Sequence, residues 1–242
     1  MLTISPRRVA SWMTLIAVAL VLASLAGSFS TYVLGHPRLF GLVRLFNVNA
    51  EANLPSWYSS IALLVCSGLL ALIARAKQQT SDRFTQSWRI LAVIFLGLSV
   101  DELASIHELL TVPLQSTLDT KGLLFYAWIL PYGALSGLLG LGYLRFLAHL
   151  PTATRHLFIL AAILYIGGAI GIEMIGGQHA SFYGEQNLEY AIITALEELL
   201  EMLGIVVFIY GLLSYMKRYI KAFQISIRDH HLEPAPEMAL KR

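Results

Sequence analysis

Apolar residues dominate six long stretches of this chain, and polar residues gather in the short intervals between them. Each stretch is long enough for a helix that crosses a bilayer, which needs about 20 apolar residues. The pattern predicts an all-α fold, a membrane bundle of six transmembrane helices in a domain over residues 1–218, with a tail at 219–242. The predicted spans cover residues 10–34, 55–75, 88–111, 122–147, 156–178 and 188–215.

The basic residues indicate how these spans are oriented. Fourteen of the 17 Lys and Arg residues fall on one side of the predicted membrane, and only Arg38, Arg44 and Lys121 fall on the other. Lys and Arg accumulate in cytoplasmic loops, so we expect both termini to be cytoplasmic. We expect a multi-pass protein of the cell membrane, and a bacterial inner membrane suits this bias. The net charge of +2 follows from topology and does not indicate a nucleic-acid partner.

Composition supports the membrane assignment. Hydrophobic residues make up 57% of the chain and charged residues only 13%, whereas about a quarter of residues are charged in soluble domains. The first apolar stretch follows Arg7 and Arg8 but is longer than the core of a secretory signal, so we expect a retained helix. The lone Cys66 excludes an intramolecular disulfide and a cysteine-based metal site. Residues 35–54 are expected to form an amphipathic surface segment or a plain connector.

Acidic residues inside the apolar stretches are the main functional clue. A carboxylate at mid-membrane costs roughly 2.5–3.5 kcal/mol, and here no basic residue lies at the same depth. Either protons or a bound metal cation must offset this cost. The seven acids concerned are Asp101, Glu102, Glu108, Glu173, Glu197, Glu198 and Glu201.

Helical geometry predicts that these acids meet. At 1.5 Å per residue, Asp101 lies about 20 Å along an outward-running helix, and all seven acids and His107 fall between mid-membrane and the outer interface. Glu197, Glu198 and Glu201 share an arc of about 100° on one helix. Glu102 lies apart from the face that carries His107. The sequence therefore predicts one carboxylate-rich site near the outer leaflet, built from three helices.

Such a site suits a divalent metal, because several oxygen ligands and an imidazole converge. We expect Fe, Mn, Zn, Mg or Ca, as one or two ions. Glu102 and Glu197 are the candidate catalytic acid/base groups, and a lipid or other apolar molecule is the expected substrate. Whether the enzyme would be an oxidoreductase or a hydrolase stays open. The candidate metal ligands are Asp101, His107, Glu108, Glu173, Glu198 and Glu201.

Two other functions fit the same residues. The acids also suit a proton- or cation-coupled carrier, although the cytoplasmic halves of the helices carry no comparable relay. In an accessory subunit of a membrane complex, the acids would be protonated and hydrogen-bonded. Small residues spaced four apart predict close packing of the fourth and fifth helices, which would also offer a face to a second copy or a partner subunit. These pairs are Gly133 and Gly137, Ser136 and Gly140, and Gly167 and Gly171. Pro131 is expected to kink the fourth helix.

Overall fold

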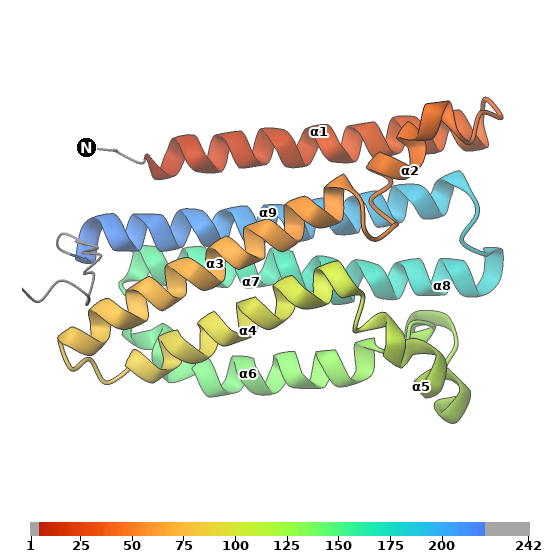
Figure 1. Cartoon of the computed structure of the whole chain (residues 1–242). Helices are drawn as coiled ribbons and strands as arrows, with labels where there is room; N and C mark the ends of the chain where they lie inside the picture. The colour runs from red at the N-terminus through yellow and green to blue at the C-terminus, as the bar shows by residue number, and fades with distance from the viewer. Residues whose placement is uncertain (1–4, 221–242) are drawn as a thin grey trace, which may run out of the picture.

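The computed structural model describes residues 5–220, and every element in that range is helical (Figure 1). The all-α bundle predicted from the hydrophobic pattern is confirmed, with long helices lying side by side. The elements are α1 (Pro6–Tyr32), η1 (Leu39–Gly41), α2 (Leu42–Phe46), α3 (Leu54–Gln79), α4 (Thr85–Ala104), η2 (Glu108–Leu110), α5 (Thr111–Leu118), η3 (Gly122–Leu124), α6 (Ile129–His149), α7 (Thr152–Ile166), η4 (Gly167–Ile172), α8 (Glu173–Tyr183) and α9 (Leu188–Tyr219).

The third predicted span is broken, so the prediction of one helix over residues 88–111 was wrong. α4 ends at Ala104 because Ser105 takes a left-handed conformation (φ 48°, ψ 41°), and the following η2–α5 segment turns away by 70°. Asp101 stabilises the break, because its Oδ1 accepts the backbone N–H of His107 at 2.9 Å. A side chain thus replaces the helical partner that this N–H would otherwise need.

The kink predicted at Pro131 is also absent. α6 begins at Ile129, later than the predicted start at residue 122, and Pro131 therefore lies in its first turn. N–H groups in a first turn have no partner within the helix, so a proline there removes no hydrogen bond. The preceding residues form the short η3 helix and a turn instead.

The fifth predicted span is a single helix from Thr152 to Tyr183, made of α7, η4 and α8. Its middle, η4, is a π-helical turn. Such turns are rare and lie frequently at functional sites.

Close helix packing occurs at other glycines than the ones predicted. Gly204 on α9 and Gly168 on η4 allow the Thr152–Tyr183 helix to approach α9 closely. A Cβ atom at Gly204 would lie 2.7 Å from the Tyr165 backbone nitrogen. A Cβ atom at Gly168 would lie 2.8 Å from the Glu197 carbonyl oxygen. The prediction that the fourth and fifth predicted helices pack backbone to backbone was therefore wrong. A Cβ would meet nothing within 4 Å at Gly137, Gly140, Gly167 or Gly171, and Gly133 approaches only the tip of the Ile170 side chain at 3.8 Å.

The main core fills the end of the bundle where α1 begins and α9 ends, which we call the basic end (Figure 1). Trp88 lies at its centre, with ring centroids of Phe146 and Tyr215 at 4.9 Å and 5.2 Å. Phe158 and Phe208 extend the aromatic packing at 4.6 Å. Edge-to-face and tilted pairs of this kind add to the stabilisation from burial alone.

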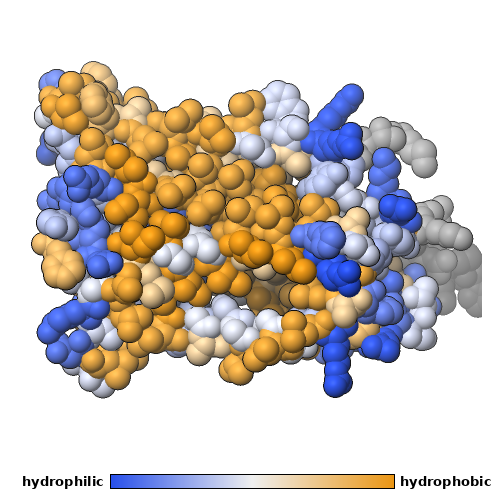
Figure 2. All heavy atoms as spheres, turned by 180° about the vertical axis from the view of Figure 1, so that it is seen from behind, coloured by the Kyte–Doolittle hydropathy of each residue, from blue (hydrophilic) through white to orange (hydrophobic). Residues whose placement is uncertain are grey.

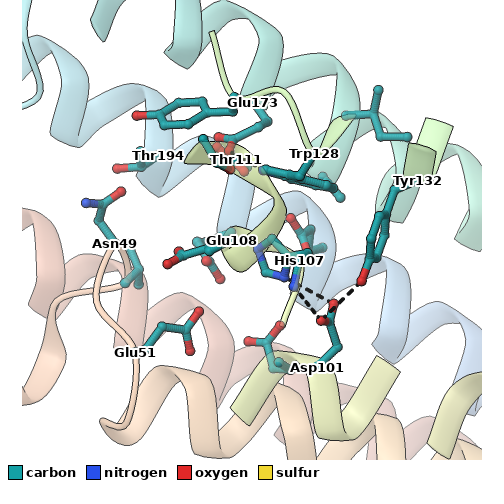
Figure 3. Close-up of a pocket in the computed structure, with 18 of the residues that line it drawn as sticks. Asn49, Glu51, Asp101, His107, Glu108, Thr111, Trp128, Tyr132, Glu173 and Thr194 are labelled. Atoms are coloured by element: carbon teal, nitrogen blue, oxygen red, sulfur yellow. Dashed lines mark hydrogen bonds and ion pairs between the residues drawn. The ribbon is translucent and has the colours of Figure 1, made fainter. Parts of the chain in front are cut away.

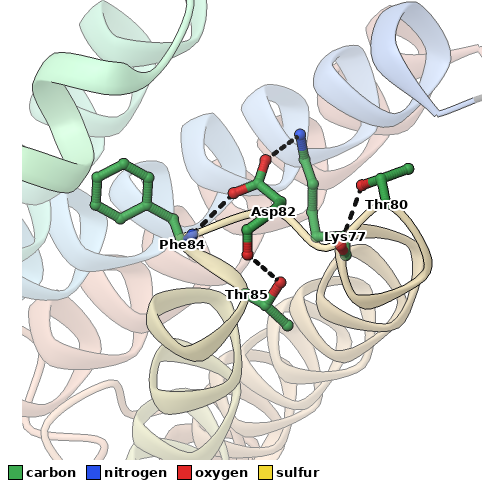
Figure 4. Close-up of polar contacts among 5 residues, drawn as sticks. All are labelled: Lys77, Thr80, Asp82, Phe84 and Thr85. Carbon is green, nitrogen blue, oxygen red and sulfur yellow. Dashed lines mark hydrogen bonds and ion pairs between the residues drawn. The ribbon is translucent and has the colours of Figure 1, made fainter.

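A compact turn joins α3 to α4 at the basic end (Figure 4). Lys77 Nζ donates to Asp82 Oδ2 at 3.0 Å, and the Phe84 backbone N–H donates to Asp82 Oδ1 at 2.8 Å. The Thr85 hydroxyl donates to the Asp82 carbonyl oxygen at 2.7 Å. Asp82 thus fixes the direction in which α4 leaves the turn.

The surface is compatible with a membrane protein. Hydrophobic side chains cover the middle of the molecule, and hydrophilic ones gather at its two ends (Figure 2). Among the described residues, α1, α3 and the Thr152–Tyr183 helix are long and apolar enough to cross a membrane, and the bent α4/η2–α5 pair adds a fourth span if it counts as one. The six-span topology, the cytoplasmic termini and the inner-membrane location stay predictions. Residues 221–242, nearly all of the predicted tail, lie outside the described residues.

Candidate functional site

A cavity of about 500 Å³ lies at the end of the bundle opposite the basic end, and we call it the acidic cavity (Figure 3). Its walls come from the loop before α3, the broken α4/η2–α5 region, the start of α6, the end of α7 with η4 and α8, and α9. None of its described lining residues is Lys or Arg. Nine carboxylates line it: Glu51, Asp101, Glu102, Glu108, Glu173, Glu185, Glu197, Glu198 and Glu201.

The eight residues proposed from the sequence as ligands or acid/base groups all lie around this one cavity. They include the pair set apart in the helical projection, His107 and Glu102. Within residues 5–220, however, no three His, Cys, Asp or Glu side chains are grouped closely enough to hold a metal ion. The shared location is therefore observed, while the role of each residue as a ligand or acid/base group stays a prediction.

His107 is held in a fixed orientation by Asp101 (Figure 3). The His107 Nδ1 atom lies 3.1 Å from Asp101 Oδ2, and the backbone bond to Oδ1 engages the other carboxylate oxygen. Tyr132 adds a longer hydrogen bond from its hydroxyl to Asp101 Oδ1 at 3.4 Å, and the Trp128 ring packs on the imidazole at 4.6 Å. Because Nδ1 is hydrogen-bonded to a carboxylate, Nε2 is the ring nitrogen that can bind a ligand or a proton. Many metal-binding histidines have this arrangement.

α9 supplies three carboxylates to the cavity from one face, as its helical period predicts. Glu197 is only 9% exposed, and its Oε2 atom is buried without a hydrogen-bond partner among the described residues. Glu173, opposite on α8, accepts a bond from Trp128 Nε1 at 3.3 Å. Gly168 brings η4 against α9 at this level, because any side chain there would meet the Glu197 carbonyl.

Glu51 also lines the cavity, although sequence reasoning missed it. It lies in the loop that the sequence analysis assigned to the outer surface, and its Oε2 is buried with no partner among the described residues. Burial, and then the nearby charge of Glu108, raise the pKa of Glu51 above its usual range. The capping box of Asn53 and Ser56 at the start of α3 fixes the conformation of this loop. In the sequence, the one signal of this ordered loop end is an Asn shortly before a Pro, which is typical of a helix start.

Glu185 is the second carboxylate that the sequence analysis did not single out. It follows α8 in a short polar loop, where it accepts a hydrogen bond from the Tyr126 hydroxyl at 2.8 Å. The Tyr126 hydroxyl is also 2.6 Å from that of Tyr190. Nothing in the sequence distinguishes Glu185 from an ordinary solvated loop residue.

Two residues near the site belong elsewhere. His179 Nε2 is hydrogen-bonded to Asn187 Oδ1 at 3.0 Å and does not line the cavity. Glu189 lies exposed in the first turn of α9. Both are therefore useful as positions for control variants.

The acidic cavity lies within the part of the chain that a family model matches. No curated protein and no solved structure matches the chain. The family model covers residues 13–216, which include most of α1 and α9, all of the other helices and every carboxylate of the cavity. The chain belongs to this family, which is described as "Domain of unknown function (DUF8692)".

Proposed function

We propose that this is a membrane protein whose acidic cavity binds one or two divalent metal ions and uses them on a lipid or another apolar molecule. The observation that carries the proposal is the set of nine carboxylates around one cavity, with no Lys or Arg among its described lining residues. Burying a carboxylate is costly unless a proton or a cation neutralises it. A divalent cation neutralises several carboxylates at once.

Two buried oxygens face the cavity without a protein donor. Glu51 Oε2 and Glu197 Oε2 have no hydrogen-bond partner within residues 5–220 when the carboxylates are ionised. Glu197 lies within side-chain hydrogen-bond reach of Glu173, so a proton shared by that pair is the alternative to a bound cation. A cation would satisfy these oxygens and neutralise the neighbouring carboxylates together.

The types of donor around the cavity suit a metal with oxygen-rich coordination, although within residues 5–220 the side chains would have to move closer together to hold one. His107 would bind through Nε2 while Asp101 orients the ring, so Asp101 acts on the metal through His107. Oxygen donors and one imidazole suit Fe, Mn, Mg, Ca or Zn. The remaining ligand candidates are Glu108, Glu173, Glu198 and Glu201.

A bound metal would supply Lewis-acid activation of a substrate oxygen or of water. Glu102 and Glu197 would then accept and return protons beside it, which is why we retain them as acid/base candidates. The apolar part of the cavity wall supports an apolar substrate. Its aliphatic residues are Val48, Leu98, Val112, Ile166, Ala169 and Ile170.

Elemental analysis of the detergent-purified full chain tests the proposal. The native protein should hold one or two equivalents of Fe, Mn, Zn, Mg or Ca, and Glu198→Gln/Glu201→Gln should lose at least half of that metal. The matched control is Glu189→Gln/Asp119→Asn, which removes two carboxylates outside the cavity. This control variant should retain the bound metal. The proposal fails if none of these ions binds to the native chain, even after reconstitution with each.

A proton- or cation-coupled carrier is the second candidate, favoured by the broken α4/η2–α5 helix and the π turn at the cavity. Broken helices of this kind form ion sites in transporters. Against it, the aromatic core around Trp88 closes the basic end. Ion flux into proteoliposomes that falls in the Glu198→Gln/Glu201→Gln variant, without bound metal in the native protein, would favour the carrier.

A further inference from the structure

A second hollow lies between the start of α1 and the end of α9. Both of these helix ends lie at the basic end of the bundle (Figure 1). The volume of the hollow is about 560 Å³. Three basic side chains and three hydroxyl groups line it: Arg7, Lys217, Arg218, Ser5, Tyr210 and Ser214.

The charge of this hollow has one sign. No Asp or Glu is among its described lining residues, and within residues 5–220 none of its three basic side chains forms an ion pair. Lys217 and Arg218 lie in the last turn of α9, where they also offset the negative end of the helix dipole. An anion in the hollow would therefore meet cations on two helices.

The start of α1 adds hydrogen-bond donors to these cations. Ser5, at the N-cap, makes no side-chain capping bond, and Pro6 in the first turn has no N–H. The N–H groups of Arg7 and Arg8 consequently have no partner within the helix. N–H groups of a first helical turn beside an Arg are a favourable setting for phosphate oxygens.

We infer that this hollow binds a phosphate group, supplied either by an anionic lipid or by a soluble phosphate. Arginine pairs with phosphate through two parallel hydrogen bonds, and the hydroxyls of Ser214 and Tyr210 can donate to the remaining oxygens. α1 is one of the helices long and apolar enough to cross a membrane, so its first turn would lie at headgroup depth. This site does not depend on the function proposed for the acidic cavity.

The first arm of the test measures lipid retention. The full chain is released from nanodiscs containing equal amounts of phosphatidylglycerol and phosphatidylcholine, and retained lipids are counted by native mass spectrometry. The test variant is Arg7→Gln/Arg218→Gln, and the matched control is Arg75→Gln/Arg155→Gln, which removes two basic side chains that do not line the hollow. A phosphatidylglycerol site predicts selective retention that falls at least about tenfold in the test variant only.

The second arm measures the thermal unfolding midpoint in detergent with inorganic phosphate, against chloride at equal ionic strength. A soluble-phosphate site predicts a rise for the native and control proteins, absent in the test variant, without selective lipid retention. The inference is overturned if neither probe binds, or if both double variants lose binding equally. Unfolding midpoints without either probe establish that the variants are folded, as the exposure of Arg7 and Arg218 leads us to expect.

Discussion

The two ends of the bundle are built on opposite principles. At the basic end, regular helices enclose a core of aromatic and aliphatic side chains around Trp88. At the other end, one helix is broken after Ala104, another contains a π turn, and carboxylates line a cavity. Helical regularity is thus kept where packing stabilises the fold, and is given up where polar groups need particular directions. The comparison predicts that stability and ligand binding respond to substitutions at different ends.

The largest expected effect on stability is at the centre of the core. Trp88 is 1% exposed, and Trp88→Ala should lower the free energy of unfolding by about 3–5 kcal/mol through lost burial and a cavity. Trp12→Ala is the control, because Trp12 is 65% exposed on α1. Equilibrium unfolding in mild detergent, followed by circular dichroism, measures both. Equal losses in the two variants would contradict the assignment of the core.

The contact between α7 and α9 at Gly204 should give the next largest loss. Gly204→Ala forces a methyl group against the Tyr165 backbone, at a cost of about 1–3 kcal/mol. Gly140→Ala meets open space and should be neutral or stabilising by about 0.5–1 kcal/mol, because alanine favours helix. The same unfolding experiment separates them. A neutral Gly204→Ala would show that the two helices do not approach as closely as described.

Glu51 should give the cavity end a stability that declines with rising pH. Burial, and then the charge of Glu108, raise its folded-state pKa, so its contribution is fully present below the unfolded pKa and is lost as pH rises through the folded value. Glu51→Gln should remove this part of the decline in the metal-free protein. Unfolding midpoints measured across about pH 4–8 test this. Glu189→Gln, whose side chain lies outside the cavity, should leave the profile unchanged.

Asp82 should make the stability of the protein depend slightly on pH in the opposite direction, with stability lost as pH falls. Burial opposes ionisation, but the Phe84 N–H and the Lys77 ammonium together lower the pKa of Asp82 below its usual value. Its contribution is therefore present above the unfolded pKa and is lost as pH falls through the folded value. Asp82→Asn should flatten the acid side of the stability profile. An unchanged acid side would contradict the role given to this turn.

The sequence predicts the parts of this structure that follow from periodicity. The hydrophobic pattern predicts the long helices, and the 100° step between residues places Glu197, Glu198 and Glu201 on one face. It does not predict the break after Ala104, since an apolar run looks continuous even where Asp101 captures the His107 N–H. Contacts between distant segments are equally hidden. Glu51 reaches the cavity because of a loop path, and Gly204 differs from Gly140 only through its neighbour on α7.

The π turn at Gly167–Ile172 also sets the phase of everything after it in the same helix. A π turn holds one residue more than the α-helical turn it replaces, so the residues after it are rotated by about 100° relative to an α-helix of the same chain length. Glu173 comes directly after this turn, so its direction depends on that extra residue. Converting Gly167–Ile172 to an ordinary α-helix at constant chain length would swing the Glu173 carboxylate away from the cavity while leaving α7 in place. A change of backbone conformation alone, with no change of amino acid at position 173, would thus remove one carboxylate from the cavity.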